Sequence, residues 1–246
     1  GQIWVAGGTY VENLTVYGFV SLYGGFSGTE TDRDERDWRT NETILDGANS
    51  GTVVQLAMGY LARGPLDGFT VTNGKAAHGG GIYCSHNSPR LANLRVIANT
   101  AASGAGIYTE DGSPTLTNCN FTGNSARDGG GISSYHGSPT LTNCTVSSNS
   151  AGRGGGIYNS YDSTPTLINC TVTGNSAPEG GGMFINGSPT LTNCLVAFNS
   201  SGIHLGGYSN ATITHCCFYN PDGYEFSGID NPVGTEGNIS ADPQCV

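Results

Sequence analysis

The chain has 246 residues, of which only 11% are charged, and its 19 acidic side chains against 9 basic ones give a formal net charge of −10. Lys75 is the only lysine, so no basic surface is available to neutralise nucleic-acid phosphates or an anionic membrane. We therefore expect no nucleic-acid partner, and we expect no membrane insertion because no apolar run reaches the length of a transmembrane helix.

Residues 1–67 predict degenerate coils of a β-structure. Strand-like segments lie at residues 3–5, 14–16, 20–22, 44–45 and 53–56. Because residues 3–5 follow the start directly, we expect a mature chain from which any signal sequence has been removed. Residues 24–42 interrupt the coils, and the mixed charges at 29–38 predict a self-paired loop or short helix on the side of the barrel.

Residues 68–216 repeat one phrase. Ser-Pro-Thr-Leu-Thr-Asn-Cys occurs at 113–119, 138–144 and 188–194, with a close variant at 164–170. Pro89 and the prolines of the four repeated phrases follow one another at intervals of 25, 25, 26 and 24 residues. This period is typical of repeats that bury a core only by stacking on their neighbours. Three short strands fit one period, and residues 217–246 are irregular again. We predict an all-β fold, a single β-solenoid domain of about eight coils spanning residues 1–246.

Several columns of this repeat have structural explanations. Period-2 alternation points Ile157, Leu167 and Val172 into the core. It also places a column of cysteines inside, which we interpret as small core hydrophobes, because thiols in a line cannot surround a metal tetrahedrally. Disulfides between adjacent coils remain the alternative. The cysteine column comprises Cys119, Cys144, Cys170, Cys194 and Cys216.

Two asparagine columns are expected to be structural ladders. The first lies between the second and third strands, where a sharp bend favours a residue that tolerates a left-handed backbone. The second closes the third strand. The first column comprises Asn93, Asn118, Asn143, Asn169 and Asn193, and the second Asn99, Asn124, Asn149, Asn175 and Asn199.

The Gly-Gly-Gly-Ile-Tyr and Ser-Pro-Thr-Leu-Thr-Asn-Cys-Thr-Val phrases resemble the right-handed parallel β-helix repeat proteins of bacterial surfaces. These are related in architecture to pectate lyases and to polymorphic outer-membrane proteins. Residues 3–10 and 22–30 look like opening coils of the same group. The resemblance implies a right-handed parallel β-helix that is secreted or displayed at the cell surface. It does not specify a reaction, because this fold serves lyases, hydrolases, adhesins and fibre subunits.

A first candidate binding strip alternates imidazole and carboxylate on successive coils. It consists of His86, Asp111, His136 and Asp162, each three residues before a repeat proline. Acidic neighbours raise the pKa of an imidazole, so the strip could respond to pH or to a divalent metal ion. The alternative is favourable charge alternation in solvated turns.

A second candidate strip is a column of aromatic residues that we expect to point outward. It consists of Tyr83, Tyr108, Tyr158 and Phe184, with Ser133 interrupting it. Stacked rings on a flat β-face can hold sugar rings or contact a partner protein. Equally, such a ladder can stabilise the coils without any ligand.

Two further patterns suggest less favoured functions. Paired threonines on the second strand, such as Thr115 and Thr117, resemble the face of ice-binding solenoids, although Ile168 breaks the array. Carboxylates such as Glu110 could serve a polysaccharide lyase or hydrolase. However, Asp128, Arg153 and Glu179 are spaced like a salt-bridge ladder, and no convergent pair is evident. We assign no catalytic residue and expect no cofactor, a structural divalent cation such as Ca²⁺ being the exception.

The ends of a solenoid need protection, since unpaired strand edges recruit other chains. In one interpretation the strand edges of the first coil are uncovered, and subunits stack head to tail into a fibre. The other folds residues 24–42 and 217–246 over the ends and leaves a monomer. We expect a structural or adhesive element that is secreted or displayed at the cell surface, and we favour a non-enzymatic role over an enzymatic one. Its expected partners are other copies of itself or cell-surface glycans. The alternative is a polysaccharide-degrading enzyme or carbohydrate-binding module.

Overall fold

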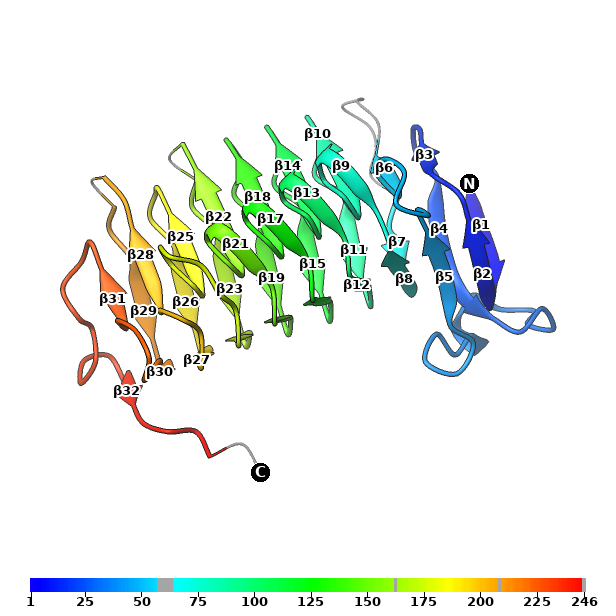
Figure 1. Ribbon diagram of the computed structural model, residues 1–246. Helices are drawn as coiled ribbons and strands as arrows, with labels where there is room; N and C mark the ends of the chain where they lie inside the picture. Colours follow the sequence, from blue (N-terminus) through cyan, green and yellow to red (C-terminus); the bar gives the residue numbers. More distant parts are fainter. Residues whose placement is uncertain (57–63, 162, 208, 245–246) are drawn as a thin grey trace.

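The computed structural model describes residues 1–56, 64–161, 163–207 and 209–244, which wind into a parallel β-helix (Figure 1). Within each sheet the neighbouring strands come from successive coils and run parallel, and the first and last coils lie at opposite ends of the solenoid. The prediction of an all-β solenoid of about eight coils is confirmed. Among the described residues no helix is long and apolar enough to cross a membrane.

Three long sheets form the walls. Sheet 1 contains β1 (Gln2–Ala6), β4 (Ser21–Phe26), β7 (Leu66–Asp67), β11 (Arg90–Ala92), β15 (Thr115–Thr117), β19 (Thr140–Thr142), β23 (Thr166–Ile168), β26 (Thr190–Thr192) and β29 (Thr212–Thr214). Sheet 2 contains β2 (Gly8–Val11), β5 (Thr43–Asp46), β8 (Phe69–Thr72), β12 (Arg95–Ile97), β16 (Asn120–Thr122), β20 (Thr145–Ser147), β24 (Thr171–Thr173), β27 (Leu195–Ala197), β30 (Cys217–Tyr219) and β32 (Ile239–Ser240). Sheet 3 contains β3 (Leu14–Val16), β6 (Val54–Leu56), β10 (Ile82–Ser85), β14 (Ile107–Glu110), β18 (Ile132–Tyr135), β22 (Ile157–Ser160), β25 (Met183–Ile185), β28 (Ile203–Leu205) and β31 (Phe226–Ser227).

A fourth, short sheet corrects the expectation of three strands per coil. It contains β9 (Lys75–His78), β13 (Thr100–Ser103), β17 (Ser125–Asp128) and β21 (Ser150–Arg153). These strands lie between sheets 2 and 3 along the chain. Their segments are rich in Ser, Ala and charged residues, so alternation of apolar residues does not mark them.

The core consists of side chains stacked in columns. In sheet 1 the middle residue of each strand pairs with its equivalent in the next coil, for example Leu116 with Leu141 and Leu141 with Leu167. All three are buried. The inward positions predicted for Ile157, Leu167, Cys170 and Val172 are therefore confirmed.

Both asparagine columns form ladders, as expected. In the buried column the Asn124 side-chain oxygen accepts from the backbone N–H of Asn99 at 3.0 Å and from its side-chain amide at 3.0 Å. The same pair of bonds recurs from coil to coil. In the exposed bend column, Asn118 has a left-handed φ of 54° and donates to the side chain of Asn93 at 3.3 Å. One column therefore satisfies buried backbone groups and the other stabilises a left-handed bend.

The cysteine column lies in the core, and its five thiols are free. Cys84 is also a buried free thiol, and burial raises its pKa well above the ordinary value. Four of the column thiols, all but that of Cys216, donate to carbonyls of the preceding coil, as Cys119 Sγ does to Leu91 O at 3.6 Å. These cysteines therefore act as core residues, which is the interpretation made from their alignment. Cys245 is outside the described residues.

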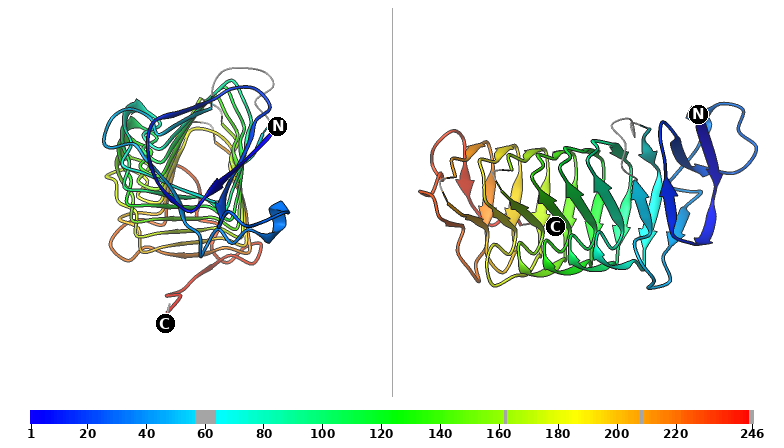
Figure 2. Two further views of the ribbon diagram at one scale, coloured as in Figure 1. Left: turned by 90° about the vertical axis from the view of Figure 1, so that its right-hand side faces the viewer. Right: turned by 90° about the horizontal axis from the view of Figure 1, so that it is seen from above.

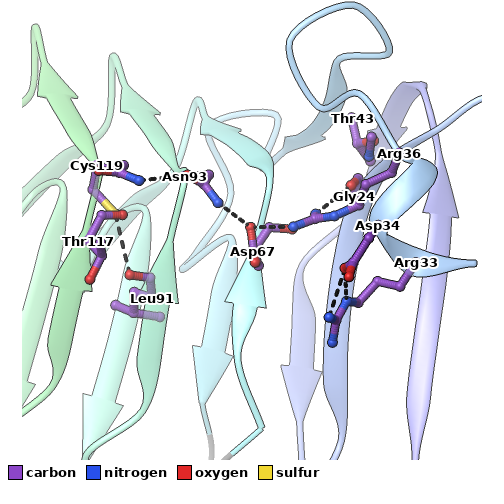
Figure 3. Close-up of polar contacts among 12 residues, drawn as sticks. Gly24, Arg33, Asp34, Arg36, Thr43, Asp67, Leu91, Asn93, Thr117 and Cys119 are labelled. Carbon is purple, nitrogen blue, oxygen red and sulfur yellow. Dashed lines mark hydrogen bonds and ion pairs between the residues drawn. The ribbon is translucent and has the colours of Figure 1, made fainter.

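The interrupting segment packs against the side of the first coils. Strand β4 continues to Phe26, so the loop itself covers residues 27–42, and it contains one 3-10 turn, η1 (Arg33–Glu35). Arg36 anchors the loop: its guanidinium pairs with Asp67 at 2.8 Å and donates to Gly24 O at 2.8 Å (Figure 3). Asp67 in turn accepts from Asn93 at 2.8 Å, so the loop is tied to the asparagine bend column (Figure 3).

Candidate functional site

His86 and Asp111 of the imidazole and carboxylate strip form a pair. His86 Nε2 lies 3.3 Å from Asp111 Oδ2, and both side chains are about half exposed. Each occupies a left-handed corner after a strand of sheet 3, which directs the side chains outward at the same edge. Ser85 Oγ lies 2.7 Å from His86 Nδ1, so the ring is held on both sides.

The alternation ends after His136, which occupies the next left-handed corner with a φ of 51°. His136 packs against the rings of Tyr135 at 4.6 Å and Tyr161 at 4.9 Å. Tyr161, with a φ of 56°, takes the next left-handed corner, where counting back from the proline had placed Asp162. The reason is one extra residue between β22 and β23, which shifts the corner by one position. Asp162 itself lies outside the described residues.

The aromatic column is more enclosed than expected. Tyr108 is only 8% exposed and Phe184 only 7%, while Tyr83 and Tyr158 are half-buried. The rings stack in two short runs, Tyr83 on Tyr108 at 5.8 Å and Tyr158 on Phe184 at 5.4 Å.

Neighbouring side chains cover these stacked rings. The His78 ring lies 4.7 Å from that of Tyr108, and the Arg153 guanidinium lies 5.2 Å above Tyr158. His78 and Arg153 both belong to the fourth sheet, which was not predicted. The column is therefore a partly covered ladder, and the expectation of an open aromatic face is wrong for Tyr108 and Phe184.

Tyr83 and Tyr108 form a polar cluster with Glu110. Tyr83 Oη donates to Glu110 Oε2 at 2.9 Å. Burial raises the pKa of Tyr83, and the hydrogen bond to Glu110 raises it further. Burial, followed by the charge of Glu110, raises the pKa of Tyr108 to about 12. Both phenols therefore remain protonated and cannot act as bases near neutral pH.

Asp128 is the centre of the charge ladder. Its buried carboxylate pairs with Arg153 at 2.9 Å and with Arg127 at 3.1 Å. Glu179 lies in register with Arg153 on the next coil. Pairing with two arginines explains a buried carboxylate without a catalytic role. Across the described ranges, no group of three or more His, Cys, Asp or Glu side chains could hold a metal ion.

The threonine array on sheet 1 is interrupted within the fold. Ile168 lies opposite Thr142 on one side and Thr192 on the other, so its apolar side chain breaks the row. In the second row of the array, Arg90 pairs with Thr115 and takes the place of a threonine. The array is therefore not a continuous threonine surface.

Two small cavities beside loop 27–42 were missed by the sequence analysis. One, of about 280 Å³, is lined by Tyr23, Arg33, Arg36, Asp67 and Arg90 among others. The other, of about 190 Å³, is lined by residues that include Trp38, Arg39, Glu42, Asn93 and Arg95. Five of the nine basic residues of this acidic chain, all arginines, therefore line these two cavities. The mixed charges of residues 29–38 were the available signal, but the coils against which they pack could not be located.

Five of the eight large apolar side chains that are exposed among the described residues lie at the N-terminal edge, within residues 3–19. Among the described residues, strands β1, β2 and β3 each pair on one side only. Ile3 is 50% exposed and Val11 is 67% exposed. Trp4, Tyr17 and Phe19 are also exposed. In the end-on view, η1 lies beside the first coil rather than over it (Figure 2).

Solved structures similar to this chain include a pectate lyase and a pectin methylesterase, both at low identity. A pectate lyase, Pel9A, is 10% identical with a TM-score of 0.47, covering 98% of this chain and 73% of that one. The deglycosylated pectin methylesterase of Aspergillus niger is 14% identical with a TM-score of 0.37, covering 98% and 81%. A comparison with curated proteins gives no match. The family model described as "Right handed beta helix region" matches residues 80–238, more than half of the chain. The chain therefore belongs to the right-handed β-helix family.

Proposed function

We propose that this protein is a non-enzymatic structural or adhesive solenoid, located outside the cell or at its surface, that associates end to end into fibres. The supporting observation is the N-terminal edge, where three strands pair on one side only among the described residues and five large apolar side chains are exposed. A free strand edge is a template for another chain, and exposed large apolar side chains beside it favour association.

The loop 27–42 does not compete for this edge. Arg36 fixes it to Gly24 and Asp67 on the flank of the solenoid. This favours open stacking over a monomer whose N-terminal end is covered by the loop. A head-to-tail contact of this kind does not close on itself and extends into a filament.

The test is the state of assembly of the purified protein. We expect light scattering and negative-stain electron microscopy to show fibres, and Ile3→Lys with Val11→Lys to abolish them by placing charges on the edge. Tyr161→Lys is the matched control, because it replaces an exposed aromatic side chain on the flank with a charged one. We expect this variant to leave the fibres intact. Short monodisperse rods of the unmodified protein would refute end-to-end association. New reducing ends or unsaturated products from acidic or neutral polysaccharides would refute the non-enzymatic role.

A second candidate is carbohydrate binding beside loop 27–42. Trp38 lines a cavity together with the pair Glu42–Arg95, so a flat ring and fixed polar groups converge there. Sugar-binding sites combine an aromatic face with such hydrogen-bonding groups. A glycan array should then give signals that Trp38→Ala abolishes. Unchanged signals in that variant would exclude this site.

A further inference from the structure

A groove at the C-terminal end of the solenoid lies along the last strand of sheet 1. After β31 the chain bows away from β29 and returns to it only at Glu236, whose carbonyl accepts from His215 N–H at 2.9 Å. The space between them is about 950 Å³ and is lined by residues 209–214 on one side and by residues from 228 to 236 on the other. Sheet 1 therefore ends at β29 with a cavity where a further strand would lie.

The backbone of β29 leaves an N–H and a C=O group directed into the groove, where they can bond to a further strand. Thr212 N–H donates to Pro189 O at 2.9 Å, and Thr214 O accepts from Asn193 N–H at 3.1 Å, so both residues face the preceding coil. In a parallel strand, alternate residues direct their backbone groups to opposite sides. Ile213 therefore directs its N–H and C=O into the groove, where the carbonyl accepts from Asn238 Nδ2 at 2.6 Å.

In the first strand, β1, the alternation of backbone groups is complementary to that of β29. Gly1 O accepts from Ser21 N–H at 2.9 Å, which turns Gly1 and Ile3 toward β4. Gln2 and Trp4 then direct their backbone groups outward, away from the solenoid. Trp4 is exposed and stacks on Phe26, with ring centroids 4.9 Å apart, so the edge is held in an extended form.

The two ends also share one side-chain column. Ile3 pairs with Leu22, and Leu191 pairs with Ile213, as the first and last steps of the inward column of sheet 1. A strand placed on β29 with Ile3 opposite Ile213 would continue this column by one coil. The apolar side chain of Ile3 would then be covered instead of exposed.

We infer that β1 of a second copy of this chain adds to sheet 1 in the groove, parallel to β29, with Gln2 opposite Thr212 and Trp4 opposite Thr214. This inference rests on the proposed end-to-end association and names its acceptor and register. In this arrangement Gln2 and Trp4 exchange backbone hydrogen bonds with Ile213, and Trp4 replaces the amide of Asn238.

The incoming copy requires a further exchange in sheet 2. Its β2 follows β1 directly and would take the position now held by β32, which pairs with β30 over two residues only. Ile239 in β32 is 54% exposed, so little apolar contact is lost when this segment leaves. Residues 237–244 therefore cover the acceptor end mainly through the buried Asn238, which bonds to Ile213 O and Cys216 N–H, and the incoming copy must replace these bonds.

Disulfide trapping tests the register. Residues paired across parallel strands lie about 4.8 Å apart, within the range that a disulfide spans. Differently tagged Gln2→Cys and Thr212→Cys proteins are mixed and oxidised mildly, and the joined peptides are identified by mass spectrometry. Gln2→Cys with Thr214→Cys is the control, because two residues of offset add roughly 6.6 Å along the strand.

We expect the joined peptide only from the Gln2 and Thr212 pair, and a higher yield from an acceptor chain that ends at Glu236. A link to position 214 instead, or a lower yield from the shortened acceptor, would overturn the inference. Fibres without either link would refute the groove while leaving end-to-end association standing. Monodisperse rods by light scattering would refute both.

Discussion

The buried asparagine ladder gives the sharpest test of how this fold is stabilised. Asn149 is 1% exposed, and its side chain donates to Phe121 O at 2.9 Å and accepts from Asn124 N–H at 2.9 Å. In Asn149→Ala, both of these buried backbone groups lose their partner. An unpaired buried polar group costs about 1–3 kcal/mol, so we expect the free energy of unfolding to fall by about 2–6 kcal/mol.

The exposed ladder provides the matched control. Asn143 donates to Asn118 at 3.4 Å in solvent, and its left-handed φ of 53° is one that glycine adopts freely. We therefore expect Asn143→Gly to change the free energy of unfolding by no more than about 1 kcal/mol. Urea unfolding followed by circular dichroism measures both. A cost for Asn149→Ala no larger than that for Asn143→Gly would refute the assignment of the buried column as the main polar support.

Three other predictions concern single side chains. The pKa of Tyr108 is raised from 10.0 to about 12. The protonated phenol therefore contributes fully to the stability of the fold below pH 10, and this contribution is lost as the pH rises toward 12. Tyr108→Phe should remove this part of the stability loss at alkaline pH, which circular dichroism measures. Cys217 is only half-buried, so a thiol reagent should label it in the native protein, whereas the buried column thiols should react only after unfolding. A Cβ on Gly25 would lie 2.4 Å from Trp38 Cα, so Gly25→Ala should displace loop 27–42 and shift tryptophan fluorescence, while Gly28→Ala, with nearly the same φ but open space, should not.

The repeat allowed the fold to be predicted because each column position recurs in the same chemical environment. A residue type that reappears every 24–26 positions identifies its own role: Leu in the core, Asn at a bend, Cys inside. The site was harder to predict because it depends on departures from the repeat. One added residue moved the corner from Asp162 to Tyr161, and a strand without apolar alternation brought His78 over Tyr108.

The ends of the solenoid explain why function is less visible than fold. A core column such as that of Leu116 constrains every coil, so its signal is repeated along the chain. A terminal strand occurs once, and neither β1 nor β29 carries a motif that marks it as an edge. The phase match between them follows from the alternation of a parallel ladder: the outward backbone groups of a first strand always fit those facing outward from a last one. Whether that fit is used therefore depends on what covers the edge: Asn238 bonds to the outward carbonyl of Ile213 in β29, and the two-residue strand β32 covers the neighbouring strand β30.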